Sequence, residues 1–527
     1  MTTIEATPAF DLLVRGGDVV DGTGAPRIRA DVGVRDGRIV EIGDLGAAAA
    51  RTTLDATGRV VAPGFIDVHV HSELAILAQT PDARGGLLQG VTTNMTAPDG
   101  FGFGGVPAAV AREIEPVLRF AHGPMPDLSF DWPTPESYLR AFEGRTPINI
   151  APQAPHLPIR VGVMGWDARV ATDAELDDMR AATAAWMRAG AVGLNSGLDY
   201  QPIAHSDTRE LVALARVAAE HGGVYAAHGR NQDLGRAGQF WETAEVGRQA
   251  GLPVNVSHER VDEEMAAMLA ETGAEPGLDL AMDTHLYEAG STHLLNYVPF
   301  AQHVGGPMAV IERLETAAYR EQLRGQIEAS LAASPEGLNA YFSATRTGRH
   351  LGRTIREIAV AAGRAPAEII VDLLRDELPD ALMVFPWGPT EAEFRPIVAA
   401  GIAHPRVVIS SDGLYWGGLP HPRGFGTFPR AIRVGVRELA ATTLEQAVNR
   451  MSGLPADRYR LADRGRIEVG RAADLVVFDP GTIADRATYA EPRLAPVGID
   501  AVVVNGLIAA DHGASTGRLA GRVLRRA

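Results

Sequence analysis

The sequence contains no cysteine and no lysine, so all 49 of its basic residues are arginine. The absence of cysteine excludes disulfides, thiolate metal ligands, iron–sulfur clusters and a cysteine nucleophile. The absence of lysine excludes Schiff-base chemistry, a Walker-type phosphate lysine and a carbamylated-lysine bridge between metal ions. Any chemistry in this chain therefore depends on other residue types.

Long apolar runs and a positive net charge are missing as well. No stretch approaches 18 uninterrupted apolar residues, and the start, MTTIEATPAFD, lacks the basic and apolar regions of a secretory signal. We therefore expect a cytoplasmic protein that does not contact membranes. The formal net charge of −16 repels polyanions and argues against a nucleic-acid partner. A small-molecule substrate is expected instead.

The chain is long enough for one large barrel with appendages or for two to three domains. It has 527 residues, 46% of them hydrophobic and 22% charged, as in ordinary soluble globular proteins. Its first 60 or so residues read as short strands, with a strong hairpin signal at Asp36-Gly37. Segments 466–480 and 498–510 are again β-rich. Two β-rich ends thus flank a different central region.

Strand-like runs alternate with helical stretches through that central region, and one helix start carries a capping-box pair, Thr172 and Glu175. Eight such βα units over about 400 residues predict an α/β fold, a (β/α)₈ TIM-type barrel with its active site at the strand C-termini. A doubly wound sheet is the alternative, but no Gly-rich dinucleotide loop follows the first strand. Residues 288–405 are too many for one crossover and are expected to hold extra helices over the barrel mouth. The eight runs are 60–71, 90–100, 148–160, 191–200, 223–230, 253–260, 278–287 and 406–413.

Candidate metal ligands lie at the ends of these runs. His69 and His71 are two residues apart, which places both imidazoles on one face of a strand. A lone pair of this kind is as often two ordinary strand histidines, but here it ends the first barrel strand. Histidine and carboxylate ligands suit Zn²⁺, with Mn²⁺, Co²⁺ and Fe²⁺ as alternatives. Further candidates end the second, fifth, sixth and eighth runs: Asp99, His228, His258 and Asp412.

Short motifs follow one another along the chain: GFIDVHVHSE, GVTTNMTAPDG, GLNSGLDY, SHER, DTHLYEAGST, SSDG and HPRGFGTFPR. On these motifs the sequence resembles the amidohydrolase superfamily and, within it, the D-aminoacylase (N-acyl-D-amino-acid deacylase) family. The resemblance spans nearly the whole chain. It implies a metal-dependent barrel at 63–460, with 288–405 as its insertion, and a small composite β-sandwich domain made from 1–62 and 461–527.

The resemblance also implies roles for single residues. One or two divalent ions per chain, Zn²⁺ first, would activate water and polarise an amide carbonyl. Asp412 would serve as general base and then as general acid, in addition to binding metal. The implied metal residues are His69, His71, His228, His258 and Asp412, and the residues implied to hold the substrate carboxylate are Arg260, Tyr287, Arg423 and Arg430.

Asp99 is where the sequence departs from that family. The family typically has a cysteine in this segment, where this chain has APDG. We expect the carboxylate of Asp99 to be the anionic ligand shared by two metal ions, and a harder oxygen ligand to alter metal preference. The alternative is a turn residue before Gly100.

Other polar residues are less clearly placed. His156, Ser196, Tyr200 and His285 lie at strand ends and are candidates for lining the pocket or for structural roles. His350, His404 and His421 are interpreted as surface or loop residues.

The predicted function is a metal-dependent hydrolase that cleaves the amide bond of N-acyl-D-amino acids, or related N-acylated amines, by metal-activated water. A cyclic amide hydrolase of the dihydropyrimidinase or dihydroorotase type is one alternative, against which the missing lysine counts. A non-catalytic amidohydrolase-like scaffold is another, against which the filled ligand positions count. The expected partner is a small molecule with a carboxylate. D against L specificity, the acyl group and assembly into a homo-oligomer are left open.

Overall fold

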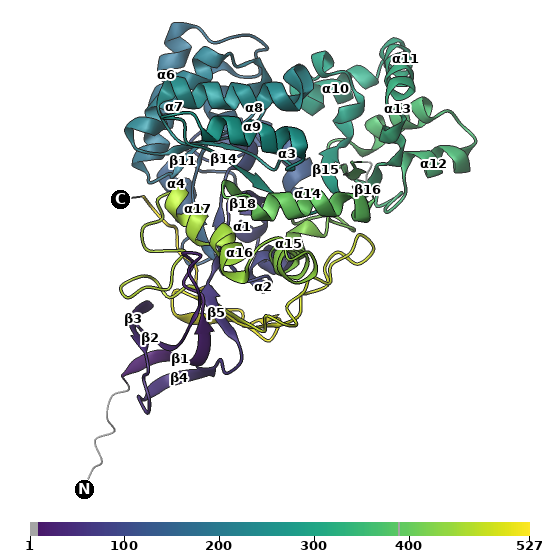
Figure 1. Ribbon diagram of the computed structural model, residues 1–527. Helices are drawn as coiled ribbons and strands as arrows, with labels where there is room; N and C mark the ends of the chain where they lie inside the picture. Colours follow the sequence, from purple (N-terminus) through teal and green to yellow (C-terminus); the bar gives the residue numbers. More distant parts are fainter. Residues whose placement is uncertain (1–8, 388–389, 527) are drawn as a thin grey trace.

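The computed structural model describes residues 9–387 and 390–526. A large body of helices and strands stands above a smaller β-rich part, in which strands from both ends of the chain lie together (Figure 1). Across the described ranges, no helix combines the length and the apolar character needed to cross a membrane.

One nine-stranded sheet joins the two ends of the chain. Its strand order is β23-β22-β21-β20-β5-β1-β2-β3, with β4 paired to β1. The chain ends meet where β5 pairs antiparallel with β20. The strands are β1 (Phe10–Val19), β2 (Ile28–Arg35), β3 (Arg38–Gly43), β4 (Ala50–Asp55), β5 (Val60–Pro63), β20 (Leu475–Phe478), β21 (Ile499–Val504), β22 (Leu507–Asp511) and β23 (Ala514–Ser515).

The predicted hairpin at Asp36-Gly37 is confirmed, since β2 and β3 pair antiparallel around it. Both turn residues have positive φ, 51° and 74°, as a two-residue type I′ connection requires.

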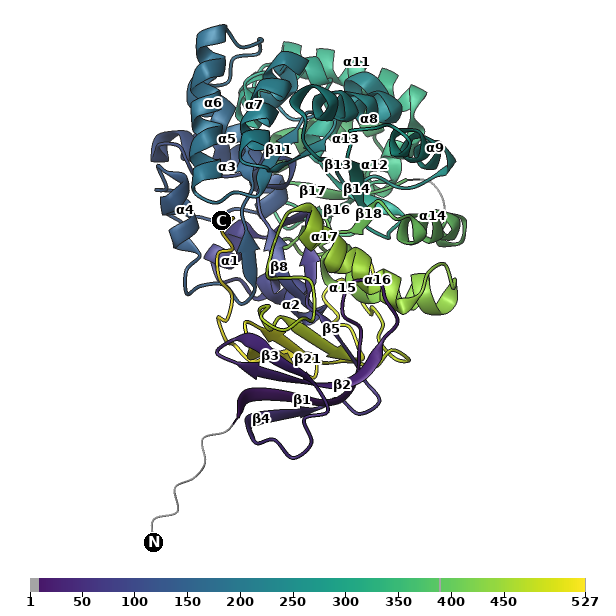
Figure 2. The same ribbon diagram turned by 60° about the vertical axis from the view of Figure 1, so that its left-hand side comes forward.

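Two glycines bend β1 and divide its partners. The register of β1 shifts between Val14 and Gly17, and its first half pairs with β4 while its end pairs with β5. Gly16 has a φ of +65°, and a Cβ at Gly17 would lie 2.4 Å from Val61 Cγ2. The bend therefore needs glycine. β4 and β5 follow one another along the edge of β1 that lies opposite β2, and Figure 2 shows β4 beside β1.

Parallel strands occupy all eight predicted runs. They form two sheets, β6-β8-β9 and β10-β11-β12-β13-β14-β18, and the pair β19-β7 brings the last run beside the first. Every pairing within these sheets is parallel. The strands are β6 (Phe65–Asp67), β7 (Val70–His71), β8 (Val91–Met95), β9 (Asn149–Ala151), β10 (Ala154–Pro155), β11 (Gly193–Gly197), β12 (Val224–His228), β13 (Val254–Val256), β14 (Leu280–Thr284), β18 (Val407–Ile409) and β19 (Gly413–Leu414).

Helices connect and cover these strands. The Thr172–Glu175 capping box is confirmed at the start of α6. The α-helices of this part are α1 (Glu73–Leu77), α2 (Gly85–Leu88), α3 (Ala108–His122), α4 (Pro135–Ala141), α5 (His156–Met164), α6 (Asp173–Arg188), α7 (Thr208–Glu220), α8 (Asn231–Ala250), α9 (Glu263–Gly273), α14 (Glu391–Ala403), α15 (Arg423–Arg430), α16 (Leu444–Met451) and α17 (Gly453–Arg458). Shorter 3₁₀ turns are η1 (Pro81–Arg84), η2 (Pro98–Gly100), η3 (Ile203–His205), η4 (Leu294–Tyr297), η5 (Phe300–Gln302) and η6 (Pro335–Asn339), and η7 (Ala431–Glu438) is a π-helix that continues α15.

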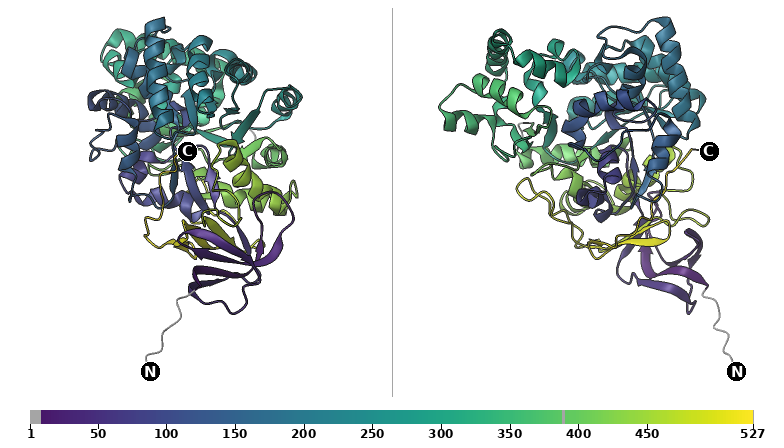
Figure 3. Two further views of the ribbon diagram at one scale, coloured as in Figure 1. Left: turned by 90° about the vertical axis from the view of Figure 1, so that its left-hand side faces the viewer. Right: turned by 180° about the vertical axis from the view of Figure 1, so that it is seen from behind.

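The region between β14 and β18 holds the expected extra helices and also a small sheet that the sequence did not indicate. Its helices are α10 (Gly306–Leu314), α11 (Ala317–Ala333), α12 (Ile355–Ala362) and α13 (Pro366–Glu377). Its antiparallel sheet has the order β15-β17-β16, formed by β15 (Ala289–His293), β16 (Tyr341–Ala344) and β17 (Leu382–Pro386). These elements share a hydrophobic core of their own, and Figure 3 shows them at the side of the large body, away from the strands of the chain ends.

Candidate metal centre

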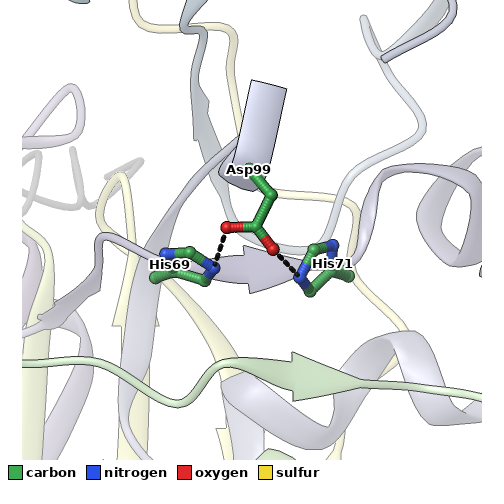
Figure 4. Close-up of side chains that lie close together, drawn as sticks. All are labelled: His69, His71 and Asp99. Carbon is green, nitrogen blue, oxygen red and sulfur yellow. Dashed lines mark ion pairs between the residues drawn. The ribbon is translucent and has the colours of Figure 1, made fainter. Parts of the chain in front are cut away.

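The first group of candidate ligands lies where the strands of the first two predicted runs end. His71 ends β7, and Asp99 lies in the 3₁₀ turn η2 that follows β8. Asp99 Oδ1 is 3.4 Å from His69 Nε2, and Asp99 Oδ2 is 3.6 Å from His71 Nε2. Figure 4 shows the carboxylate between the two imidazoles, with one oxygen directed at each.

A strained turn directs Asp99 into this position. Ala97 and Asp99 both have positive φ, 60° and 56°, and the Glu73 carboxylate accepts a hydrogen bond from the Ala97 N–H. Aspartate tolerates this left-handed conformation better than most residues. The APDG segment thus suits both the turn and an inward-pointing carboxylate.

A second group shares the same aspartate. Asp99 Oδ1 lies 3.5 Å from His258 Nε2 and 4.0 Å from His228 Nδ1, and these two imidazole nitrogens are 2.9 Å apart. His228 ends β12, and His258 follows β13 with a φ of 40°. One carboxylate therefore belongs to two groups of three potential metal ligands, each with its donor atoms within 4.8 Å.

Asp412, which lies between β18 and β19, completes the cluster. Its Oδ1 lies 3.7 Å from His69 Nε2 and 3.5 Å from His71 Nε2, while its Oδ2 accepts a hydrogen bond of 2.8 Å from Arg423 Nη2. The structure thus brings together all six residues predicted to bind metal.

The geometry and chemistry of these residues fit divalent ions. His69 Nε2 and Asp99 Oδ1 are buried without a hydrogen-bond partner, which is costly unless another ligand satisfies them. Two donors about 2.1 Å from a tetrahedral Zn²⁺ lie about 3.4 Å apart, which is the spacing between these two atoms. The donor set of histidine nitrogens and carboxylate oxygens suits zinc.

Both carboxylates are held in the ionised form. Burial raises the pKa of Asp99, but the charge of His69 and the close approach of the His258 and His228 imidazoles outweigh it and keep that pKa well below its ordinary value. Burial likewise raises the pKa of Asp412, and the Arg423 charge with the His71 hydrogen bond brings it well below the ordinary value. Each aspartate is thus an anionic donor at neutral pH.

Three further carboxylates, which sequence reasoning missed, support the cluster. Asp283 accepts hydrogen bonds from the backbone N–H of His258 and from Ser410 Oγ, at 3.1 and 2.6 Å. Asp199 Oδ2 lies 3.3 Å from His228 Nε2, so a hydrogen bond donated by this ring nitrogen leaves Nδ1 on the side of Asp99. A carboxylate on the second ring nitrogen fixes the orientation of a metal-binding histidine. The third, Asp67, accepts from Ser411 beside the last strand, and all three acids lie within predicted strand runs, a signal that could have revealed them.

The cluster opens into a cavity of about 540 Å³. Arg260 and Arg423, two of the four predicted substrate residues, line it together with five of the six metal candidates. Tyr287 and Arg430 are not among its lining residues. The Arg430 guanidinium instead lies 4.6 Å above the Tyr287 ring and donates to the Leu286 carbonyl. For these two residues a substrate role stays a prediction.

The remaining polar candidates divide into two kinds. Tyr200 and His285 line the cavity. His156 and Ser196 do not. His156 lies between Ser196 Oγ at 3.0 Å and Glu210 Oε1 at 2.9 Å, an arrangement of the triad type that is fully buried. It faces neither described cavity, so we assign it a structural role.

His421 was interpreted as a surface or loop residue; it lies in the loop before α15, but it is not at the surface. Its side chain is fully buried, with ring contacts to Tyr287 and Tyr489. His421 Nδ1 accepts from the Arg423 N–H at 3.0 Å, and Nε2 donates to the Ala289 carbonyl at 2.9 Å. Tertiary packing buries this loop residue, and its hydrogen bond to the Arg423 N–H holds the start of α15.

Comparisons with known proteins agree with this arrangement. The model of the amidohydrolase family matches residues 52–510. A D-aminoacylase from Alcaligenes xylosoxydans xylosoxydans is 34% identical over 535 residues, covering 98% of each chain. An N-acyl-D-glutamate deacylase from the same organism is 35% identical over 528 residues, covering 98% of this chain and 97% of its own.

Solved structures show the same likeness. The N-acyl-D-glutamate deacylase of Bordetella bronchiseptica, complexed with zinc and a phosphonate mimic of the tetrahedral intermediate, superposes with a TM-score of 0.81 at 34% identity, over 98% of this chain and 99% of that one. A D-aminoacylase described as having a binuclear metal centre superposes with a TM-score of 0.78 at 32% identity, over 98% and 100%.

Proposed function

This chain belongs to the amidohydrolase family, and from that premise we propose that it is a metal-dependent hydrolase that cleaves the amide bond of N-acyl-D-amino acids. The observation that carries the proposal is the sharing of Asp99 between two groups of histidines at the mouth of an arginine-lined cavity. The likeness over 98% of the chain to a D-aminoacylase and to an N-acyl-D-glutamate deacylase supports the substrate class.

Every position predicted to bind metal carries a histidine or an aspartate, whose side chain offers a donor atom. When bound, one or two divalent ions would supply Lewis-acid activation of water and of the amide carbonyl. His69, His71 and Asp99 would hold one ion, and Asp99, His228 and His258 the other. Zn²⁺ is the first expectation, with Mn²⁺, Co²⁺ and Fe²⁺ as alternatives.

Asp412 is proposed as the proton carrier. Its Oδ1 faces the two histidines of the first strand, and its Oδ2 is held by Arg423 at 2.8 Å. Because Arg423 keeps this buried carboxylate ionised, Asp412 is ready to accept a proton from the attacking water and to pass it to the leaving nitrogen. No covalent intermediate on the protein is required.

Arg260 and Arg423 are proposed to orient the substrate. Both line the cavity into which the cluster opens. A guanidinium can bind a carboxylate through two parallel hydrogen bonds, which fixes the direction of the bound amino acid. The scissile amide is thereby directed toward the aspartates.

The finer architecture is proposed on the same basis. Residues 63–460 form a closed (β/α)₈ barrel with 288–405 as an insertion, and 1–62 with 461–527 form a composite β-sandwich domain. The parallel pairing through all eight runs and the β19-β7 pair support the closure. The nine-stranded sheet and the bend in β1 support the composite domain. A cytoplasmic location and a homo-oligomeric state stay predictions.

Two alternatives are disfavoured by particular observations. A cyclic amide hydrolase of the dihydropyrimidinase type usually uses a carbamylated lysine, and this chain has no lysine. A non-catalytic scaffold would not need two complete donor groups opening into a cavity.

The test is a substrate screen. Purified protein supplied with Zn²⁺, Mn²⁺ or Co²⁺ is incubated with N-acetyl and N-formyl D- and L-amino acids and with cyclic amides, and released amine is measured. We expect turnover of N-acyl-D-amino acids and none of their L-enantiomers. Turnover confined to cyclic amides, or none by metal-loaded protein, would overturn the proposal.

A further inference from the structure

The names of the known relatives differ in the amino acid that is released, and two of them specify an acidic side chain, D-glutamate or D-aspartate. Resting on the function proposed above, we propose that this enzyme deacylates N-acyl-D-amino acids with uncharged side chains and discriminates against N-acyl-D-glutamate. The argument is an inventory of the cationic groups that face the substrate.

Three arginines line the described part of the cavity: Arg236, Arg260 and Arg423. Arg236 is fully committed to the protein. Its Nε donates to Glu259 Oε2 at 3.0 Å, its Nη1 to Asp262 and its Nη2 to the Arg260 carbonyl at 3.0 Å. With two carboxylates on one guanidinium, Arg236 has no net positive charge to offer a ligand.

Arg423 is committed as well. It is buried, and its Nη2 donates to Asp412 Oδ2 while its Nη1 contacts His285 Nε2 at 3.1 Å. Its Nε has no partner in the protein and can still donate a hydrogen bond to the substrate. Its positive charge, however, is already balanced by the negative charge of Asp412.

Arg260 is the remaining cation. Its guanidinium lies over the Trp387 ring at 5.3 Å, and the carboxylate recorded near it, that of Asp262, is 3.8 Å away and already binds Arg236. One uncommitted guanidinium matches one carboxylate, the α-carboxylate that every N-acyl-amino acid carries.

A second carboxylate, on the side chain of the substrate, would find no further uncommitted arginine in the cavity. Apart from the three arginines and the metal-binding candidates, the cavity lining has the acids Asp199 and Glu259, the imidazoles of His285 and His293, and neutral amides and hydroxyls such as Gln239 and Ser291. The imidazole of His293 adds no charge, because burial lowers its pKa to about 3. An anionic side chain would therefore lose water without gaining a cation.

Space beside the cluster is apolar. A smaller cavity shares Phe120, Asp199, Tyr200 and His293 with the large one. Its other lining residues are mostly aliphatic and aromatic, such as Leu157 and Leu295. An uncharged side chain can pack against this wall, and a carboxylate cannot do so without an energetic cost.

The experiment compares two isosteric substrates. kcat/KM is measured with metal-loaded enzyme at neutral pH for N-acetyl-D-glutamine and N-acetyl-D-glutamate, which differ in charge but hardly in shape. N-acetyl-D-leucine serves as an apolar reference. We expect kcat/KM for N-acetyl-D-glutamine and N-acetyl-D-leucine to exceed that for N-acetyl-D-glutamate by about tenfold or more. The reason is that burying the side-chain carboxylate without a cationic partner costs binding free energy that the uncharged side chains do not lose.

A charge variant tests the cause. Glu259→Gln removes one acid from the cavity and frees part of Arg236, so the glutamine-to-glutamate ratio should fall at least threefold. Glu245→Gln changes charge equally on the same helix as Arg236, at a side chain that is 44% exposed and pairs with Arg248. This control should keep the wild-type ratio. Metal content is measured for every protein, so that a change in loading is recognised.

The outcomes separate the two proposals. A ratio at or below one in the wild-type enzyme, or an unchanged ratio in Glu259→Gln, overturns the charge inference while leaving N-acyl-D-amino acid hydrolysis intact. Failure to hydrolyse all three substrates overturns the proposed function, and the inference with it.

Discussion

At the scale of single residues, the account depends most on Asp99. Its carboxylate contacts His69 and His71 on one side and His228 and His258 on the other. A ligand shared between two ions does more than hold each of them, since its charge also reduces their mutual repulsion. The sequence predicted this role from the position of the residue, whereas its positive φ became evident only in the structure.

Asp99→Asn tests the shared ligand while keeping the turn, because asparagine also tolerates positive φ. Metal content per chain should fall below that of wild type, and turnover should drop by on the order of 10²-fold or more, since a ligand and its charge are lost together. Ala97→Gly alters the same turn without touching the carboxylate and should keep wild-type metal content. Wild-type metal content and turnover in Asp99→Asn would show that Asp99 is only a turn residue.

Asp412→Asn tests the proton carrier. Proton transfer by a positioned side chain is worth roughly 10²–10⁴ in rate, so turnover should fall by on the order of 10²-fold or more. Metal content should fall less than in Asp99→Asn, because His69 and His71 keep Asp99 as their other partner. Wild-type turnover at neutral pH would remove Asp412 from its proposed role.

At the scale of elements, the positions of the parallel strands were predictable from the sequence, whereas the small sheet β15-β17-β16 and the burial of His421 were not. The parallel strands coincide with the predicted runs to within one residue, because alternation of apolar strands and amphipathic helices is a local signal. The sheet β15-β17-β16 escaped prediction because β16 and β17 are short and lie among helices. His421 was misplaced because its burial comes from residues distant in sequence, Tyr287 and Tyr489.

The buried cluster around Glu210 joins α5, α7 and β11. Glu210 accepts from His156 at 2.9 Å and from Arg160, and all three side chains are fully buried. Glu210→Ala leaves a buried arginine without its counter-charge, so the free energy of unfolding should fall by about 3–5 kcal/mol. Denaturant unfolding measures this, with the exposed Glu220→Ala on the same helix as control. Ser196→Ala should keep wild-type turnover, and its inactivation would contradict a purely structural cluster.

The same cluster predicts how stability depends on pH. Burial raises the pKa of Glu210, but His156 and Arg160 outweigh it and lower the pKa from 4.5 to about 2. Because the folded pKa lies below the unfolded one, this stabilisation is present above about pH 4.5 and is lost as the pH falls toward 2. Wild type should therefore lose more stability than Glu210→Ala over that interval. Parallel losses in the two proteins would exclude this contribution.

At the scale of the whole molecule, the sheet of the two chain ends is connected directly to the parallel strands of the central region. β5 leads directly into β6 and pairs with β20, so the sheet of the chain ends adjoins the first barrel strand that leads to His69 and His71. The β-rich character of both ends was readable from the sequence. Their pairing across more than 400 residues was not, since it was expected only from the resemblance to a family.

The central claim is that hydrolysis depends on metal ions held by the shared carboxylate cluster. The most direct measurement is divalent metal content per chain together with hydrolysis of N-acetyl-D-leucine, in protein treated with excess chelator and after return of Zn²⁺, Mn²⁺ or Co²⁺. The account predicts that chelation removes both the metal and the activity, and that a divalent ion restores both. Full activity in excess chelator, from protein containing no divalent ion, would contradict it.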